Sequence, residues 1–435
     1  MIHCYPHDFA VQVHRFLTEV IPPETLYPLP DVGSLELLIS TCYQASLMRE
    51  EERPVRFRLI LRDPEQFPSG QGPPDGLNRL VFTLPQAFTG DELRRISPAT
   101  NFDTSLIGVT IDALGTPSIW GIVHSGSRWL QVFRGGSQRI NPLPDSLIIF
   151  VTGPGRISVS VGATLIAGLR GGQVVRTDQE LFTAGWLQHL TSAHRDELWV
   201  MHEEARQQAT TKWADISPDF PLILGQNLLR RVISLVRNHR HGGALIIVPT
   251  TRTQELKEPN PYLNIKYNFR LDEGRQRIHP QIVRLMNEFA RIAGSWELGG
   301  EPVGWSEYVA STDPTLSQLD ETLYEMTHLL AELSLIDGAV VLNHRFEVLG
   351  FGAEIYSGLD NVPVIQKALD LEGSVRESES PKGMGTRHRS AYRLCMALKD
   401  AVVIVVSQDG HVRFVRWHNG AVTCWDQVAT GILDF

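Results

Sequence analysis

The stretch Asp337-Gly338-Ala339-Val340-Val341-Leu342 places a carboxylate and a glycine directly before a short apolar strand. The residues in front of it, Thr315 to Ser334, carry leucines at helical spacing and follow an Asp-Pro pair that is typical of a helix start. A helix, a tight turn and a buried strand in succession predict an α/β domain with a mixed sheet.

A second polar motif, Gly385-Thr386-Arg387-His388-Arg389-Ser390, follows about fifty residues later. It lies where a glycine-containing segment is expected to enter a helix, and free N–H groups at a helix N-terminus favour an anion. Arginines at that end oppose the helix dipole, so a purely structural role explains them poorly. Arginine matches phosphate oxygens bidentately, and a carboxylate such as Asp337 suits a phosphate-bound divalent ion. Taken alone, however, Asp-Gly is also a common turn dipeptide.

The elements around the two motifs extend the α/β pattern upstream to about Pro221. This pattern includes an apolar helical face over residues 228–236 and a hairpin turn at Gln408-Asp409-Gly410. We expect a long polar loop over residues 360–383. The predicted helices are 228–236, 280–293, 315–334 and 387–399, and the predicted strands are 244–248, 340–342, 347–351 and 401–406.

Together, the two motifs and the elements that precede them resemble the diadenylate cyclase family, whose members join two ATP molecules into the second messenger cyclic di-AMP. The resemblance is strong over Leu335 to Ile355 and Gly383 to Ser407, and weaker upstream to Pro221. It implies a catalytic domain over residues 220–435, built on a mixed sheet with helices on both faces. It also implies a divalent metal, Mg²⁺ or Mn²⁺, as cofactor.

The resemblance assigns roles to individual residues. It implies a catalytic role for Asp337, Arg387, His388 and Arg389, and metal ligation by Asp337 and Asp409. The residues expected to bind the nucleotide are Gly338, Ala339, Gly352, Ile355, Gly385, Thr386, Ser390 and Ser407. From the residues alone, the segment from Gly350 to Ile355 is equally well explained as a glycine-broken core strand.

The end of the last core strand departs from the family pattern. Many members carry Ser-Glu-Glu where this chain has Ser407-Gln408-Asp409, so a carboxylate is either shortened to Asp409 or replaced by Gln408. An alternative function is therefore a weak or inactive sensor that binds ATP or cyclic di-AMP. A scaffold that binds no nucleotide is a third hypothesis.

In the expected reaction, the 3′-hydroxyl of one ATP attacks the α-phosphate of the other, and pyrophosphate leaves twice. Such chemistry depends mainly on positioning and charge neutralisation. Because the product is two-fold symmetric, we expect a homo-oligomer in which two catalytic domains face each other, as a dimer or a higher assembly.

The first half of the chain is expected to regulate this domain. Residues 1–95 predict a mixed α/β region with a helix over Leu35 to Arg49 and a strand over Val55 to Leu61. Residues 96–180 predict a β-rich, sensor-like region, with strands within 118–133, 146–151 and 157–167 that suggest a small sheet or barrel of its own. Residues 181–219 predict a helical connector. The signal, a small molecule or a protein, is unknown.

Composition and short motifs limit the number of domains, the partners and the location that we expect. The 435 residues suffice for two or three domains, and the net charge of −9 gives no strong nucleic-acid signal. No segment predicts a membrane span or a secretory signal, so we expect a cytoplasmic protein without a membrane partner. Four cysteines without a Cys-x-x-Cys pair indicate neither a zinc ribbon nor a disulfide framework. His202-Glu203 lacks the second histidine of a zinc-protease helix, and His239 and His241 are best explained as a surface helix end.

Overall fold

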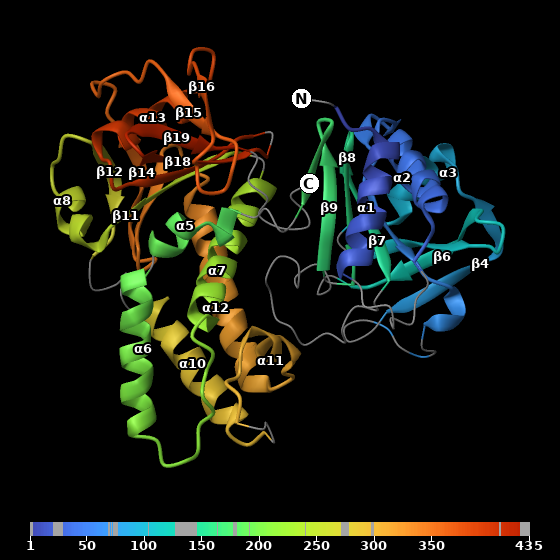
Figure 1. The fold of residues 1–435 in the computed structure, drawn as a ribbon, viewed down its shortest axis with the longest axis horizontal. Helices are drawn as coiled ribbons and strands as arrows, with labels where there is room; N and C mark the ends of the chain where they lie inside the picture. Colours follow the sequence, from blue (N-terminus) through green and yellow to red (C-terminus); the bar gives the residue numbers. More distant parts are fainter. Residues whose placement is uncertain are drawn as a thin grey trace. The chain divides into compact units, whose positions relative to one another are not determined.

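The chain divides into two compact units, Met1–Gln179 and Glu180–Thr430, which we call the N-terminal and C-terminal units (Figure 1). The computed structural model describes residues 3–20, 29–67, 70, 72, 77–102, 104–126, 146–162, 164–176, 181–190, 192–239, 241–270, 278–296, 300–408 and 410–426. Among these residues, no helix is both long and apolar enough to span a membrane.

The N-terminal unit is an eight-stranded sheet with helices packed on one face. The strand order is β10-β9-β8-β7-β3-β5-β6-β4. Apolar residues of the helices share one buried cluster with alternate residues of the strands, including Phe57, Leu59 and Leu61. The elements are α1 (Pro6–Val20), α2 (Val32–Ser46), β1 (Arg49–Glu50), β2 (Arg53–Pro54), β3 (Phe57–Leu61), β4 (Asn78–Ala87), α3 (Gly90–Ile96), β5 (Ser105–Ile111), β6 (Pro117–His124), β7 (Leu147–Gly153), β8 (Arg156–Val161), β9 (Thr164–Arg170) and β10 (Gln173–Arg176).

Two sequence predictions for this unit were wrong. The β-rich segment does not form a sheet of its own, because β3 lies between β7 and β5 and pairs with both. The single strand predicted over 157–167 is a hairpin of β8 and β9, turned at Gly162, whose φ of +53° suits glycine. Both errors concern strand pairing, which residue pattern alone does not specify. Residues 127–133 of another predicted strand lie outside the described residues.

The C-terminal unit is built on a nine-stranded mixed sheet of order β12-β14-β13-β11-β17-β18-β19-β15-β16. Its strands are β11 (Gly243–Val248), β12 (Leu263–Asn268), β13 (Ala339–Asn343), β14 (Val348–Ile355), β15 (Ile365–Ala368), β16 (Arg376–Glu379), β17 (Val402–Val406), β18 (Val412–His418) and β19 (Ala421–Trp425). Its α-helices are α5 (Gly185–Leu190), α6 (Ser192–Gln207), α7 (Phe220–Asn238), α8 (Thr253–Lys257), α10 (His279–Ala293), α11 (Trp305–Ala310), α12 (Pro314–Leu333) and α13 (Thr386–Ala397).

Helices cover both faces of this sheet. On β11, Leu245 and Ile247 join the cluster that includes the apolar faces of α7, α10 and α12. The alternate residues Ala244, Ile246 and Val248 join a second cluster with α13. A strand buried on both faces needs apolar residues at every position, which explains the unbroken run in the sequence. The predicted α/β fold, with a mixed sheet and helices on both faces, is confirmed.

The expected polar loop over residues 360–383 was wrong in part, because it contains the hairpin β15–β16. β15 pairs in parallel with β19 and so extends the sheet at its edge. β16 is partly or fully exposed along its length, so its polar residues give no apolar alternation to detect.

Strand directions bring several chain segments to one edge of the sheet. β11 runs parallel to β13 and antiparallel to β17, with Gly243 opposite Val406. The starts of β11 and β13 and the end of β17 therefore meet at the same edge. The Asp337 turn precedes β13, so it lies at this edge too.

Candidate functional site

Asp337 and Arg387 meet at this edge. An Arg387 guanidinium nitrogen, Nη2, lies 3.7 Å from Asp337 Oδ1. The Asp337 side chain is 96% exposed and that of Arg387 is 33% exposed. Exposed ion pairs contribute at most about 1 kcal/mol to stability, so the fold does not depend on this one. The carboxylate is therefore free to take a ligand from solvent.

The turn before β11 also contacts Arg387. Its Nη1 donates to the backbone carbonyl of His241, 3.4 Å away. Gly242, the next residue, has φ +71°, and a Cβ there would lie 2.9 Å from the Val406 carbonyl oxygen and 3.0 Å from Arg387 Nη1. Only glycine fits between these groups without a shift.

Gly338 is equally constrained. Its φ is +113°, and a Cβ would lie 2.5 Å from the carbonyl carbon of Gly352 and 2.8 Å from the Ala353 nitrogen. Ala339 pairs with Ala353 across β13 and β14. The Asp337 turn thus packs directly on the predicted nucleotide-binding segment of β14. Gly352 itself has φ +64° and lies against the Tyr267 ring.

His388 follows Arg387 on α13. Its imidazole is partly buried, and burial lowers its pKa, with the charges of Arg413 and His411 adding to the effect. The imidazole is therefore neutral at neutral pH. It offers a hydrogen bond and adds no positive charge to those of Arg387 and Arg389. Arg413 is held beside it by two bonds to Asp426.

The other predicted residues of the second motif lie at the start of α13. Gly385 is the residue before the helix, and the Arg389 N–H donates to its carbonyl. Thr386 and Arg389 are exposed, and Ser390 is partly buried. This end of the helix therefore presents polar side chains to solvent, beside the nitrogen that faces Asp337.

Two further predicted residues lie at the ends of strands. Ser407 follows β17, and its hydroxyl oxygen accepts from the His411 N–H at 3.0 Å. Ile355 ends β14, pairs with Leu263 and is partly buried. Asp409, the second predicted metal ligand, lies outside the described residues.

Sequence reasoning missed two parts of this edge. The first is the His241-Gly242 turn, because His241 was interpreted only as part of a surface helix end. The helix α7 ends before His241, at Asn238, with His239 as its C-cap. Adjacent glycines before a buried strand are the signal that indicates a close backbone approach. The second is Arg413, a largely buried basic residue near the start of β18, whose charge acts on His388.

Comparison with known proteins gives one family match. Residues 24–124 match the model of a family described as "Probable sensor domain DACNV". The matched segment includes α2 to β6, whereas the sheet of the N-terminal unit also uses β7 to β10. No curated protein matches the chain.

Among solved structures, the chain is similar to the hypothetical membrane spanning protein from Bacillus cereus, at 15% identity and a TM-score of 0.21. The match covers 45% of this chain and 61% of that chain, which is less than two thirds of the other protein's length. A likeness at this TM-score supports no conclusion about function. The family match therefore stands alone: residues 24–124 are similar to a probable sensor domain.

Proposed function

We propose that the C-terminal unit is a diadenylate cyclase domain that condenses two ATP molecules into cyclic di-AMP and two pyrophosphates. The proposal depends on one observation: a nearly fully exposed carboxylate, Asp337, lies 3.7 Å from Arg387 of the second motif. The two motifs whose sequence resembles the cyclase family are thus neighbours in the fold.

The residues at the edge suit the phosphates of a nucleotide. Arg387 supplies a planar fork of donors, and the start of α13 supplies backbone N–H groups. Arg389 and Thr386 are exposed beside it and add a charge and a hydroxyl. When phosphate binds, Arg387 exchanges its exposed contact with Asp337 for stronger bidentate bonds.

A divalent ion fits the donor set. Asp337 offers a hard, exposed carboxylate oxygen, which Mg²⁺ and Mn²⁺ prefer, and phosphate oxygens would complete the shell. When bound, such an ion neutralises phosphate charge and favours attack by the ribose hydroxyl. Asp337 would hold it, while Arg387 orients the phosphates and His388 donates or accepts a hydrogen bond as a neutral imidazole.

The reaction requires two such sites. The 3′-hydroxyl of each ATP attacks the α-phosphate of the other, so we propose that two C-terminal units face each other in the active homo-oligomer. The N-terminal unit would control this encounter. The match of residues 24–124 to a probable sensor domain supports that role, since sensor domains of this kind are associated with diadenylate cyclases.

Product analysis tests the proposal. Purified protein is incubated with ATP and Mg²⁺ or Mn²⁺, and cyclic di-AMP is resolved by chromatography. Formation of cyclic di-AMP in wild type and its loss in Asp337→Asn support a cyclase. Absence of the product under both metals, across a range of protein concentrations, contradicts it.

A second candidate is a nucleotide-binding sensor without turnover. It is favoured by Gln408, an exposed amide at a position where the family pattern has a carboxylate. This candidate predicts that ATP or cyclic di-AMP raises the melting temperature of the chain while no product forms. A chain that responds to neither nucleotide contradicts both candidates.

A further inference from the structure

A second cluster of reactive side chains lies in the C-terminal unit, on α6 and at the start of α10. His194 and Glu197 are one turn apart on α6, and His279 is the first residue of α10. One donor atom from each of the three lies within 4.8 Å of the other two. The imidazole rings of His194 and His279 are 4.6 Å apart between centroids.

Three ring nitrogens of the two histidines in this cluster are buried and have no hydrogen-bond partner among the described residues. His194 is 5% exposed, and both of its ring nitrogens are in this group. The third is Nε2 of His279. His194 Nδ1 lies 4.0 Å from Glu197 Oε2, too far for a hydrogen bond. Buried polar atoms are nearly always bonded, so these nitrogens require a partner that the described residues do not supply.

The surroundings favour a cation at this place. Arg345 pairs with Glu197 Oε1, which leaves Oε2 as the carboxylate oxygen toward His194. An open hollow of about 550 Å³ adjoins the cluster, and Asp196, Glu204 and Glu347 line it together with Glu197. Four carboxylates outnumber the single guanidinium of Arg345, so the hollow attracts positive charge.

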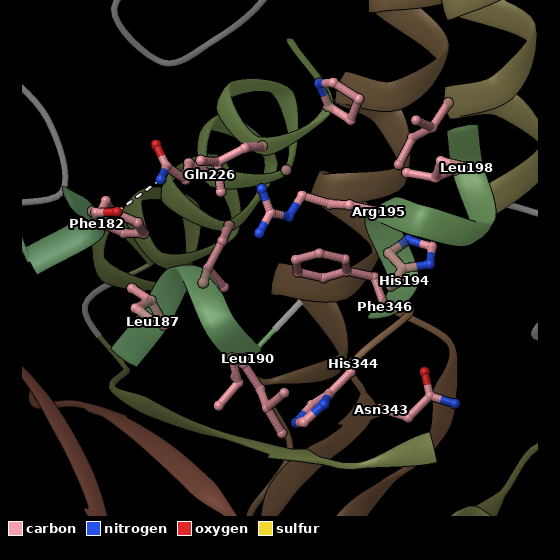
Figure 2. Close-up of a pocket in the computed structure, with 16 residues that line it drawn as sticks. Phe182, Leu187, Leu190, His194, Arg195, Leu198, Gln226, Asn343, His344 and Phe346 are labelled. Atoms are coloured by element: carbon pink, nitrogen blue, oxygen red, sulfur yellow. Dashed lines mark hydrogen bonds between the residues drawn. The ribbon is translucent and has the colours of Figure 1, made fainter. Parts of the chain in front are cut away.

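The other side of His194 is shielded from solvent. His194 also lines a small cavity of about 40 Å³, which is less open than the acidic hollow and has a largely apolar wall (Figure 2). Leu187, Leu190 and Phe346 are part of that wall. Burial lowers the pKa of His194 to about 3, so its ring carries no charge at neutral pH. A ligand therefore approaches from the acidic hollow.

We propose that His194, Glu197 and His279 bind one divalent transition-metal ion, with Zn²⁺ as the reference ion. Two imidazoles and a carboxylate are a ligand set that zinc accepts with water in the fourth position. Zinc–ligand bonds of about 2.0–2.2 Å bring the donors of a tetrahedral site to about 3.4 Å from one another, so the cluster closes by roughly 1 Å. The ion ties α6 to α10. This proposal is independent of the cyclase reaction.

Metal titration of the full chain tests this site. The protein is stripped with a chelator and titrated with Zn²⁺ by calorimetry, without nucleotide. We expect one ion per chain with a Kd of about 1 µM or tighter, and a rise in Tm of about 5 °C at a hundredfold excess over Kd. Co²⁺ should give the visible absorption of a tetrahedral nitrogen and oxygen site.

Three variants assign the ion to the cluster. His279→Gln and Glu197→Gln, both at partly exposed residues, should each weaken Zn²⁺ binding by about tenfold or more and abolish the Co²⁺ spectrum. His189→Gln is the matched control, because His189 is exposed on α5 and outside the cluster. Circular dichroism checks that each variant is folded.

Clear outcomes would overturn the proposal. The proposal is wrong if the wild-type protein binds no Zn²⁺. It is also wrong if both cluster variants bind Zn²⁺ as tightly as wild type does. Asp337→Asn tests the alternative that Zn²⁺ occupies the candidate nucleotide site. Loss of binding in that variant, with retention in His279→Gln, places the ion at the other site and rejects the cluster.

Discussion

The Arg387 guanidinium lies 3.7 Å from the Asp337 carboxylate and donates to the carbonyl of His241, so one side chain connects the starts of β11, β13 and α13. These three segments are far apart in the sequence. Their contact at one sheet edge links the two motifs, and the predictions below begin with this contact.

Asp337→Asn should lower cyclic di-AMP formation by about 10²-fold or more, because the amide removes the charge that holds a divalent ion. The melting temperature should stay close to that of wild type, since the side chain is 96% exposed. Chromatography of the product and circular dichroism measure the two effects. Asp360→Asn, at another exposed aspartate of the same unit, is the matched control. Unchanged turnover in Asp337→Asn would remove this residue from the mechanism.

Arg387→Lys should weaken ATP binding by about tenfold, because a lysine keeps the charge but loses the planar fork that matches phosphate. Isothermal titration with ATP and Mg²⁺ measures the affinity. Arg284→Lys, an exposed position on α10, should bind ATP like wild type. Equal affinity in both variants would show that Arg387 does not contact the phosphates.

Gly242→Ala should destabilise the chain by about 2–4 kcal/mol. The alanine would have to adopt a left-handed backbone conformation, and its Cβ would lie 2.9 Å from the Val406 carbonyl oxygen. Gly420→Ala isolates the backbone contribution: Gly420 has φ +84°, and no atom of the described residues lies within 4 Å of the added Cβ. That control should cost about 1 kcal/mol. Denaturant unfolding followed by circular dichroism measures both, and equal losses would contradict the close approach.

Asp320→Ala should destabilise the C-terminal unit by about 3–5 kcal/mol, because it leaves the Arg231 charge buried without its partner. Arg231 Nη2 lies 2.9 Å from Asp320 Oδ1, both side chains are 3% exposed, and the Tyr308 hydroxyl donates to the same oxygen. The double variant Arg231→Met with Asp320→Leu should recover most of this loss. A double variant as unstable as the single one would mean that packing, not charge, dominates there.

His344 should make stability fall with acid. Burial lowers its pKa to about 4, so the unfolded chain, with a pKa near 6.5, takes up the proton first. Stability from this group is complete above about pH 6.5 and is lost as the pH falls toward 4, by about 2 kcal/mol at pH 5. His344→Gln, compared with wild type by urea unfolding in chelator at pH 8 and pH 5, should reduce the difference between the two pH values. An identical pH dependence in the variant would contradict a buried neutral ring.

Elements whose signals are local could be predicted from the sequence. The Asp313-Pro314 cap and the leucine stripe fix α12, and the unbroken apolar runs fix β11, β13 and β17, because a strand covered on both faces needs an apolar side chain at every position. The two polar motifs can also be recognised in the sequence, because each is short and continuous.

Most contacts between distant segments became known from the folded chain. The position of β3 between β7 and β5, and the addition of β15 to β19, depend on hydrogen bonds between distant backbones that carry little sequence information. The approach of Arg387 to Asp337 was predicted from the resemblance, whereas the cluster of His194 and His279 was not, because its members look like ordinary helix residues until α6 and α10 pack together.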